Sequence, residues 1–175
     1  MKDGLGRSID YLRISVIDKC NLRCTYCMPV EGFEWIPKSE ILRYEEIQAI
    51  VREMAGMGLR RVRITGGEPL VRKDLSELVS QLRTITEIED IALSTNAILL
   101  PRFATELRLA GVDRVNISLD TLRRDRFEEI ARRPVRLFDE TMRGIEATER
   151  VGFAPIKINT VLLRGLNDDE VAEFA

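Results

Sequence analysis

Five short segments rich in β-branched residues alternate along this chain with segments in which apolar residues recur at helical spacing. The expected strands are residues 11–16, 61–65, 90–94, 114–119 and 156–161, and the expected helices lie within residues 44–54, 75–85, 103–110 and 138–145. Parallel neighbouring strands need a helical crossover between them, so this succession predicts an α/β fold with a parallel sheet. With 175 residues, 45% of them hydrophobic, the chain is long enough to bury the core of one domain.

The two faces of the expected strands differ in character. In the first strand Leu12 and Ile14 alternate with Arg13 and Ser15, and three other strands repeat the pattern. A sheet buried on both faces would be apolar on both, so we expect helices over the apolar face and a polar lumen, as in a partial β/α barrel. The polar residues expected on the lumen face are Arg13, Ser15, Arg63, Thr65, Ser94, Asn116, Ser118 and Lys157. This set predicts an anionic ligand rich in hydrogen-bonding groups; contact with plain solvent at the strand ends is the alternative.

Three cysteines, Cys20, Cys24 and Cys27, follow the first strand within eight residues and are the only cysteines in the chain. Cubic iron–sulfur clusters normally take four thiolates, so three would leave one iron open to a small chelating molecule. A zinc site would have to recruit carboxylates because the chain has no histidine, and a disulfide would leave an odd thiol. The loop is therefore interpreted as a cluster site. Sites in parallel α/β folds lie at the carboxyl ends of strands, so cluster and lumen should share one mouth.

A second loop feature, the run Thr65-Gly66-Gly67-Glu68-Pro69, follows the second strand directly. Paired glycines let a backbone approach a ligand closely, and proline fixes the direction in which the chain leaves. We expect the Glu68 side chain near the rim of the same mouth.

Charge and hydropathy exclude several classes of protein. The net charge of −2 gives no bulk electrostatic case for binding nucleic acid or an anionic membrane, and no apolar run approaches the length of a membrane span. The first ten residues lack the apolar core of a signal peptide, so a reducing, cytoplasmic location is expected. Residues 167–170 (NDDE) indicate the cap and first turn of a further helix, which Ala175 interrupts, so the chain is expected to be truncated.

The cysteine loop and the Gly-Gly-Glu-Pro turn together resemble the radical S-adenosylmethionine (SAM) superfamily. The resemblance implies that Cys20, Cys24 and Cys27 hold a [4Fe–4S] cluster, that SAM chelates the fourth iron, and that reduction releases a 5′-deoxyadenosyl radical. It also implies SAM contacts from Tyr26, Gly67 and Ser118.

Longer motifs resemble the GTP 3′,8-cyclases, radical SAM lyases of molybdenum cofactor (molybdopterin) biosynthesis. They are residues 6–7 (GR), 10–16 (DYLRISV), 27–29 (CMP), 63–70 (RITGGEPL), 116–120 (NISLD), 157–161 (KINTV) and 165–168 (GLND). The resemblance implies that the radical removes the C3′ hydrogen of GTP, giving (8S)-3′,8-cyclo-7,8-dihydroguanosine 5′-triphosphate, and that GTP is bound by Arg13, Arg63, Ser94 and Lys157. No side chain is assigned a catalytic role. The implied partners are an external one-electron donor and a downstream molybdopterin-pathway enzyme, with a homodimer left open.

Two features depart from that family. Ala97 stands where the family usually has a glycine, which disfavours a left-handed turn there. The family also has a C-terminal part with three further cysteines for a second [4Fe–4S] cluster. Residues 1–175 are therefore expected to be the N-terminal radical SAM core only, inactive alone; a gene product that lacks the second cluster is the other reading. The alternatives are a radical SAM maturase that modifies peptides, and a non-catalytic iron–sulfur electron-transfer domain.

Overall fold

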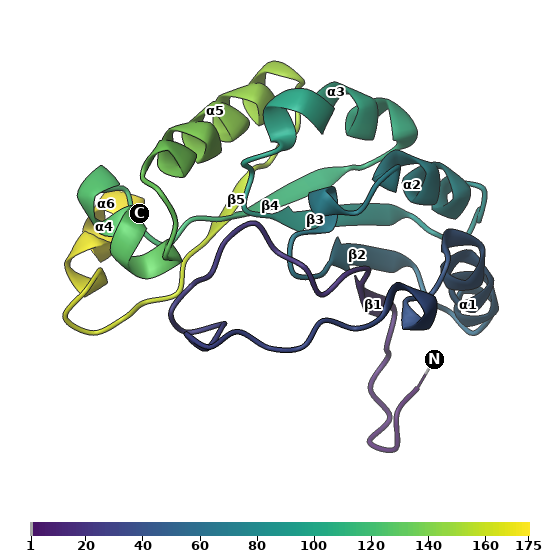
Figure 1. The fold of residues 1–175 in the computed structure, drawn as a ribbon. Coiled ribbons are helices and arrows are strands. Elements are labelled where there is room, and N and C mark those ends of the chain that lie inside the picture. The colour runs from purple at the N-terminus through teal and green to yellow at the C-terminus, as the bar shows by residue number, and fades with distance from the viewer. Residues whose placement is uncertain (1) are drawn as a thin grey trace.

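The computed structural model describes residues 2–175 and contains one five-stranded parallel sheet. The strands are β1 (Tyr11–Ser15), β2 (Arg61–Thr65), β3 (Asp90–Thr95), β4 (Arg114–Ser118) and β5 (Lys157–Asn159), and they lie side by side in chain order (Figure 1). Over the described residues the sheet is not closed. The prediction of an α/β fold with an incomplete barrel is confirmed.

The helices of the described residues are α1 (Tyr44–Gly56), α2 (Leu75–Arg83), α3 (Leu100–Ala110), α4 (Arg124–Ala131), α5 (Arg136–Arg150) and α6 (Val171–Phe174), with 3₁₀ turns η1 (Lys38–Glu40), η2 (Pro69–Val71) and η3 (Asp168–Glu170). Four of these six helices, α1, α2, α3 and α5, lie in connections between strands and pack on one face of the sheet, whereas α4 and α6 lie beside it with the cysteine loop. Apolar spacing predicts α1, α2, α3 and α5, but α4 is not among the expected helices, although Phe127, Ile130 and Ala131 are its buried face. In Figure 1, α1, α2, α3 and α5 form one layer over the sheet.

The core lies between the sheet and that helical layer. Ile64, Leu93 and Ile117, from the middle strands, are fully buried with apolar residues of the helices. At about 25 cal/mol per Å² of apolar surface, this burial is the main driving force for the layered arrangement. The alternation of each strand then turns its polar residues to the opposite face.

The strand register aligns those polar residues into rows across the sheet. In one row, Arg13 on β1 lies opposite Arg63 on β2. In the next row, two residues closer to the carboxyl ends of the strands, Ser94, Asn116 and Lys157 lie opposite one another on β3, β4 and β5. The predicted polar face therefore exists as an ordered surface, which we call the polar face.

The end of the chain differs from expectation in two places. Strand β5 is shorter than predicted because Val161 N donates to Asp120 Oδ1 at 2.9 Å and so leaves the ladder. Asn167 does precede a helical turn, but its side chain does not cap it: Nδ2 donates to the carbonyls of Asp120 and Val161 at 2.5 and 2.9 Å. The buried side chain of Asn167 therefore joins the segments after β4 and β5 by hydrogen bonds and does not cap a helix.

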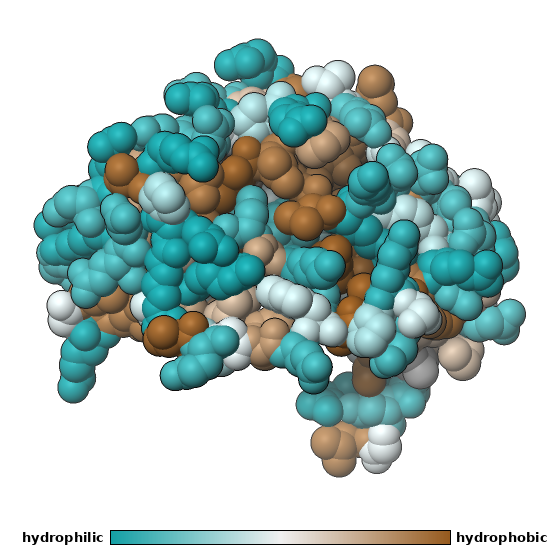
Figure 2. Space-filling model, in the orientation of Figure 1, coloured by the Kyte–Doolittle hydropathy of each residue, from teal (hydrophilic) through white to brown (hydrophobic). Residues whose placement is uncertain are grey.

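The molecular surface is mixed in character. Figure 2 shows hydrophilic residues over most of the visible face, with apolar side chains scattered among them. Within residues 2–175, no helix combines the length and the apolar character that crossing a membrane would require.

Candidate functional site

The cysteine loop is held in place by the end of α4. Arg23 N and Thr25 N donate to the carbonyls of Ala131 and Ile130 at 3.0 and 2.9 Å. In Figure 1 the loop leaves the carboxyl end of β1, runs toward α4 and returns to α1. The backbone of the loop is therefore positioned by an element about a hundred residues later in the chain.

Two arginines just after α4 extend this support. Arg132 Nη1 donates to the Met28 carbonyl at 3.0 Å, and Arg133 Nε donates to the Asn21 carbonyl at 3.0 Å. Sequence reasoning missed both, and the only local signal was the helical spacing of apolar residues in α4. The partners of these arginines could not be predicted, because they are backbone carbonyls, which every residue of the chain has.

The three thiols lie on this loop, where a turn closed by the hydrogen bond from Cys27 N to Cys24 O at 3.0 Å joins the second cysteine to the third. Cys20 and Cys24 are partly buried, Cys27 is exposed, and Leu22 N donates to Cys20 Sγ at 3.3 Å. Burial raises the pKa of the Cys20 thiol and raises that of Cys24 to about 12, and the charges of neighbouring groups, other cysteines among them, add to both shifts. Among residues 2–175 no three His, Cys, Asp or Glu side chains are already gathered as metal ligands.

The chemistry of this donor set suits iron. Soft thiolates are the ligands of iron–sulfur clusters, and hydrogen bonds to the sulfur atoms are a normal feature of such sites. A bound cation deprotonates its thiols outright, which removes the effect of a raised thiol pKa. Three thiols on one loop with an amide N–H directed at Cys20 Sγ therefore fit a cluster that has one open iron.

The paired glycines make their close approach to the chain's own cysteine loop. Gly67 N donates to the Ile17 carbonyl at 2.6 Å, and Glu68 N donates to the Lys19 carbonyl at 2.8 Å. A Cβ atom on Gly67 would lie 2.3 Å from Asp18 O. The close approach of these glycines thus lets the turn after β2 hold the residues that lead into Cys20, and the contact of Gly67 with SAM stays a prediction.

Glu68 is also placed differently from the prediction. It is 1% exposed rather than at the rim, and its carboxylate accepts hydrogen bonds from Leu70 N, Thr95 Oγ1 and Asn96 N at 3.1, 2.7 and 2.8 Å. Burial raises its pKa to about 7, although these hydrogen bonds act in the opposite direction. Glu68 therefore joins the carboxyl ends of β2 and β3.

Ala97 adopts the left-handed turn that its side chain was expected to disfavour. Its φ is 66°, and it is fully buried. Gly144 of α5 packs directly on it, since a Cβ atom there would lie 2.1 Å from Ala97 O. The surrounding packing overrides the conformational preference of alanine at this turn.

Tyr26 connects the cysteine loop to the end of β4. Its hydroxyl donates to Asp120 Oδ2 at 2.7 Å, while Asp120 Oδ1 accepts the hydrogen bond from Val161 N. Burial and this hydrogen bond both raise the pKa of Tyr26. Ser118, the last residue of β4, lies opposite Asn159 two residues before Asp120. Tyr26 and Ser118, both expected SAM contacts, thus lie at the same end of the sheet.

The cations of the polar face divide into paired and unpaired groups. Arg61 binds Asp10 at 2.6 Å, and Arg114 binds both oxygens of Asp90. Within residues 2–175 no carboxylate lies within ion-pair distance of the three other cations of this face, Arg13, Arg63 and Lys157.

Two buried donors on the polar face lack any hydrogen-bond partner in the described residues. They are Arg63 Nε and Asn116 Nδ2. The Arg63 guanidinium lies over the Tyr11 ring, 5.6 Å from its centroid. Buried polar groups are almost always hydrogen-bonded, so donors left free on one surface indicate a place where a ligand supplies the acceptors.

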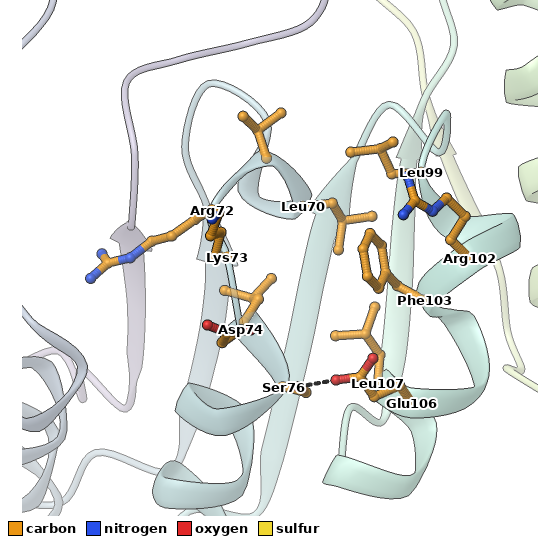
Figure 3. A pocket seen from close by; sticks show the side chains of 12 residues that line it. Leu70, Arg72, Lys73, Asp74, Ser76, Leu99, Arg102, Phe103, Glu106 and Leu107 are labelled. Carbon is orange, nitrogen blue, oxygen red and sulfur yellow. Dashed lines mark hydrogen bonds between the residues drawn. The ribbon is translucent and has the colours of Figure 1, made fainter.

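A cavity of about 410 Å³ lies elsewhere, between the start of α2 and α3. Leu70, Leu99, Phe103 and Leu107 line it, and Ser76 donates a hydrogen bond to Glu106 at its edge (Figure 3). Its position in the helical layer separates it from the polar face. The predicted site residues are therefore not gathered in this cavity.

Residues 14–175 match the model of the Radical SAM superfamily. The chain is 54% identical over its whole length to the GTP 3′,8-cyclase of Heliobacterium modesticaldum, covering 53% of that protein, and 52% identical over 99% of its length to the GTP 3′,8-cyclase of Petrotoga mobilis, again covering 53%. The chain thus spans about half the length of these curated relatives.

Two solved structures share the fold. The crystal structure of Streptococcus suis SuiB superposes with a TM-score of 0.71 at 23% identity, over 94% of this chain and 36% of that one. The FeFe-hydrogenase maturase HydG from Carboxydothermus hydrogenoformans superposes with a TM-score of 0.65 at 18% identity, over 85% and 35%. At these identities the likeness concerns the fold alone.

Proposed function

This chain belongs to the radical SAM superfamily, and on that premise we propose that it is the N-terminal core of a GTP 3′,8-cyclase that acts in molybdenum cofactor biosynthesis. The whole protein would convert GTP into (8S)-3′,8-cyclo-7,8-dihydroguanosine 5′-triphosphate. Sequence identities of 54% and 52% to two proteins named GTP 3′,8-cyclase, over essentially the whole chain, support this substrate.

The observation that carries the proposal is the set of unpaired cations on the polar face. Arg13, Arg63 and Lys157 have no carboxylate partner in residues 2–175, and Arg63 Nε is a buried donor without an acceptor. Guanidinium and ammonium groups pair strongly with phosphate oxygens, so this face would hold the triphosphate. Ser94, in the same row as Lys157, would add a neutral hydrogen bond.

The cofactor residues would lie at the carboxyl edge of the sheet. Cys20, Cys24 and Cys27 would ligate a [4Fe–4S] cluster, and Tyr26, Gly67 and Ser118 would contact SAM. When bound, the cluster and SAM would supply the 5′-deoxyadenosyl radical chemistry needed to remove the C3′ hydrogen of GTP. The protein's part is to hold the nucleotide on the polar face with C3′ toward that edge and to keep water away.

The complete protein would need further components. A second [4Fe–4S] cluster near the base would come from a C-terminal part of the kind that the longer relatives have room for. An external one-electron donor would reduce the first cluster, and a downstream molybdopterin-pathway enzyme would take the product. We place the protein in the cytoplasm, where thiolate ligands stay reduced.

The proposal is tested with the full-length gene product, reconstituted anaerobically with iron and sulfide, reduced, and given SAM with GTP deuterated at C3′. Deuterium in the 5′-deoxyadenosine formed supports the cyclase. 5′-Deoxyadenosine without deuterium would refute GTP as the substrate and redirect the search to peptides. If no 5′-deoxyadenosine forms and SAM leaves the cluster unaffected, electron transfer is the only function left of those considered.

A matched pair of variants tests the cation assignment. Arg63→Ala should weaken GTP binding on the order of tenfold to a hundredfold, because a charge-assisted bond is lost. Arg61→Ala removes a cation from the same strand and face, but one that Asp10 already neutralises, and should leave GTP binding within about twofold. Equal effects of the two variants would contradict the assignment.

A further inference from the structure

Asn116 lies at the centre of the polar face. In the strand register it stands opposite Ser94 on β3 and opposite Lys157 on β5. Its sequence neighbours Val115 and Ile117 belong to the hydrophobic core, so the side chain of Asn116 points to the other face of the sheet. It is thus placed between two residues proposed to bind the nucleotide.

Asn116 is buried yet makes no side-chain hydrogen bond within residues 2–175. It is only 4% exposed, and its Nδ2 is one of four buried side-chain atoms that find no partner in the part of the chain that the structure describes. An unsatisfied buried amide lowers folding stability, so a position that keeps one needs an explanation outside the fold itself.

Another buried asparagine shows what a structural role looks like in this chain. Asn167 is fully buried, and all its polar atoms are used: Nδ2 donates to two carbonyls and Oδ1 accepts from Leu163 N at 2.7 Å. Asn116 has the same side chain and nearly the same burial but none of these bonds. The contrast assigns Asn116 to binding rather than to folding.

We propose that Asn116 Nδ2 donates a hydrogen bond to a phosphate oxygen of the bound nucleotide. The inference rests on the proposed function and adds a substrate contact to it. An anionic acceptor is favoured because Lys157 is the adjacent residue in the row and has no carboxylate partner among residues 2–175.

The position along the strands indicates which part of the nucleotide is bound. The row of Ser94, Asn116 and Lys157 lies two residues, or about 6.6 Å, closer to the carboxyl edge than the row of Arg13 and Arg63. With C3′ directed to the carboxyl edge, the arginines meet the terminal phosphates. The amide of Asn116 then meets the phosphate nearest the ribose.

The test uses the full-length protein with the cluster reconstituted, and it measures GTP affinity by equilibrium dialysis and stability by thermal unfolding without nucleotide. Asn116→Leu removes the donor at similar volume, and Asn116→Asp replaces it with a carboxylate. We expect the dissociation constant for GTP to rise on the order of tenfold in Asn116→Leu and further in Asn116→Asp. Inorganic tripolyphosphate, used to displace GTP, should lose affinity for Asn116→Leu by a similar factor.

Stability separates binding from a structural role. The unfolding temperature of Asn116→Leu without nucleotide should be equal to or above that of the wild type, whereas Asn167→Leu, which loses three internal hydrogen bonds, should unfold at a clearly lower temperature. A destabilised Asn116→Leu, or one that keeps GTP affinity within about twofold, overturns the inference. Loss of GTP affinity without loss of tripolyphosphate affinity overturns the phosphate contact.

GTP binding by the wild-type protein distinguishes a failure of this inference from a failure of the proposed function on which it rests. If the wild-type protein binds GTP and the Asn116 variants bind it equally well, only the role of Asn116 is refuted. If the wild-type protein does not bind GTP, the proposed function itself fails, and the inference fails with it.

Discussion

Substituting Gly67 with alanine should loosen the cysteine loop from the turn after β2. The added Cβ would lie 2.3 Å from Asp18 O and 2.4 Å from Lys19 O, which are backbone atoms and cannot rotate away. The turn and the loop must therefore separate. That separation strains the bond from Gly67 N to Ile17 O at 2.6 Å and the bond from Glu68 N to Lys19 O at 2.8 Å.

The size of the effect follows from three contributions. Forcing one extra carbon into a packed site costs about 1–3 kcal/mol. Two weakened backbone hydrogen bonds cost about 1 kcal/mol each, and the stiffer unfolded chain of alanine returns about 0.4–1 kcal/mol. Gly67→Ala should thus lower the free energy of unfolding by about 2–5 kcal/mol.

The assay is urea denaturation of the full-length apoprotein without SAM, followed by iron content per protein after anaerobic reconstitution. Leaving SAM out separates the loop from any contact of Gly67 with SAM. Gly56→Ala is the control, because within residues 2–175 no atom outside the surrounding backbone of α1 lies within 4 Å of the Cβ it would add at the end of that helix. It should be stabilised by about 0.5–1 kcal/mol and load iron normally. Equal behaviour of the two variants would refute the close packing of turn and loop.

Three further outcomes are expected. Gly144→Ala should destabilise the protein by about 1–3 kcal/mol in urea denaturation, because its Cβ would meet the backbone of Ala97; unchanged stability would contradict that contact. Burial raises the pKa of Glu68 to about 7 from an ordinary 4.5. Its contribution to the stability of the apoprotein should therefore be present below pH 4.5 and fall by up to about 3 kcal/mol as the pH rises to 7. Glu68→Gln should remove this fall from a plot of the free energy of unfolding against pH. Tyr26→Phe keeps the ring but loses the bond to Asp120, so the free energy of unfolding should drop by about 1 kcal/mol while SAM affinity, measured by dialysis, stays within a few-fold; a large loss of SAM affinity would show that the hydroxyl itself contacts SAM.

The parts of the fold that follow from local sequence were predicted well. The bounds of β2 agree with the expected strand, and α1, α2, α3 and α5 contain the expected apolar spacings. Periods of 2 and about 3.6 residues are properties of the backbone itself, so they can be read without knowing the partner of any side chain. The face that carries Arg13, Arg63 and Lys157 was predicted for the same reason.

Errors arose where a residue's environment comes from distant parts of the chain. Glu68 was expected at the rim, but Thr95 and Asn96, 27 and 28 residues later, surround its carboxylate. Ala97 was expected to resist a left-handed turn, but contact with Gly144 of α5 fixes it in one. The apolar residues of α4 recur at helical spacing, so the helix itself could have been predicted. Its role in holding the cysteine loop could not, because that role depends on hydrogen bonds between backbone groups, which carry no sequence signature.

The amino-acid sequence by itself determined the alternation of strands and helices, the polar face and the three cysteines on one loop, because each is a pattern of neighbours along the chain. Only the tertiary structure decided that Arg61 is neutralised by Asp10 while Arg63 has no carboxylate partner among residues 2–175. It also decided that Asn116 Nδ2 is buried without a hydrogen-bond partner in that part of the chain, whereas the side chain of Asn167 makes three hydrogen bonds. Two arginines of one strand, or two asparagines, are chemically identical in sequence. Which of them is left to bind a ligand depends on which side chains and carbonyls the folded chain brings to it.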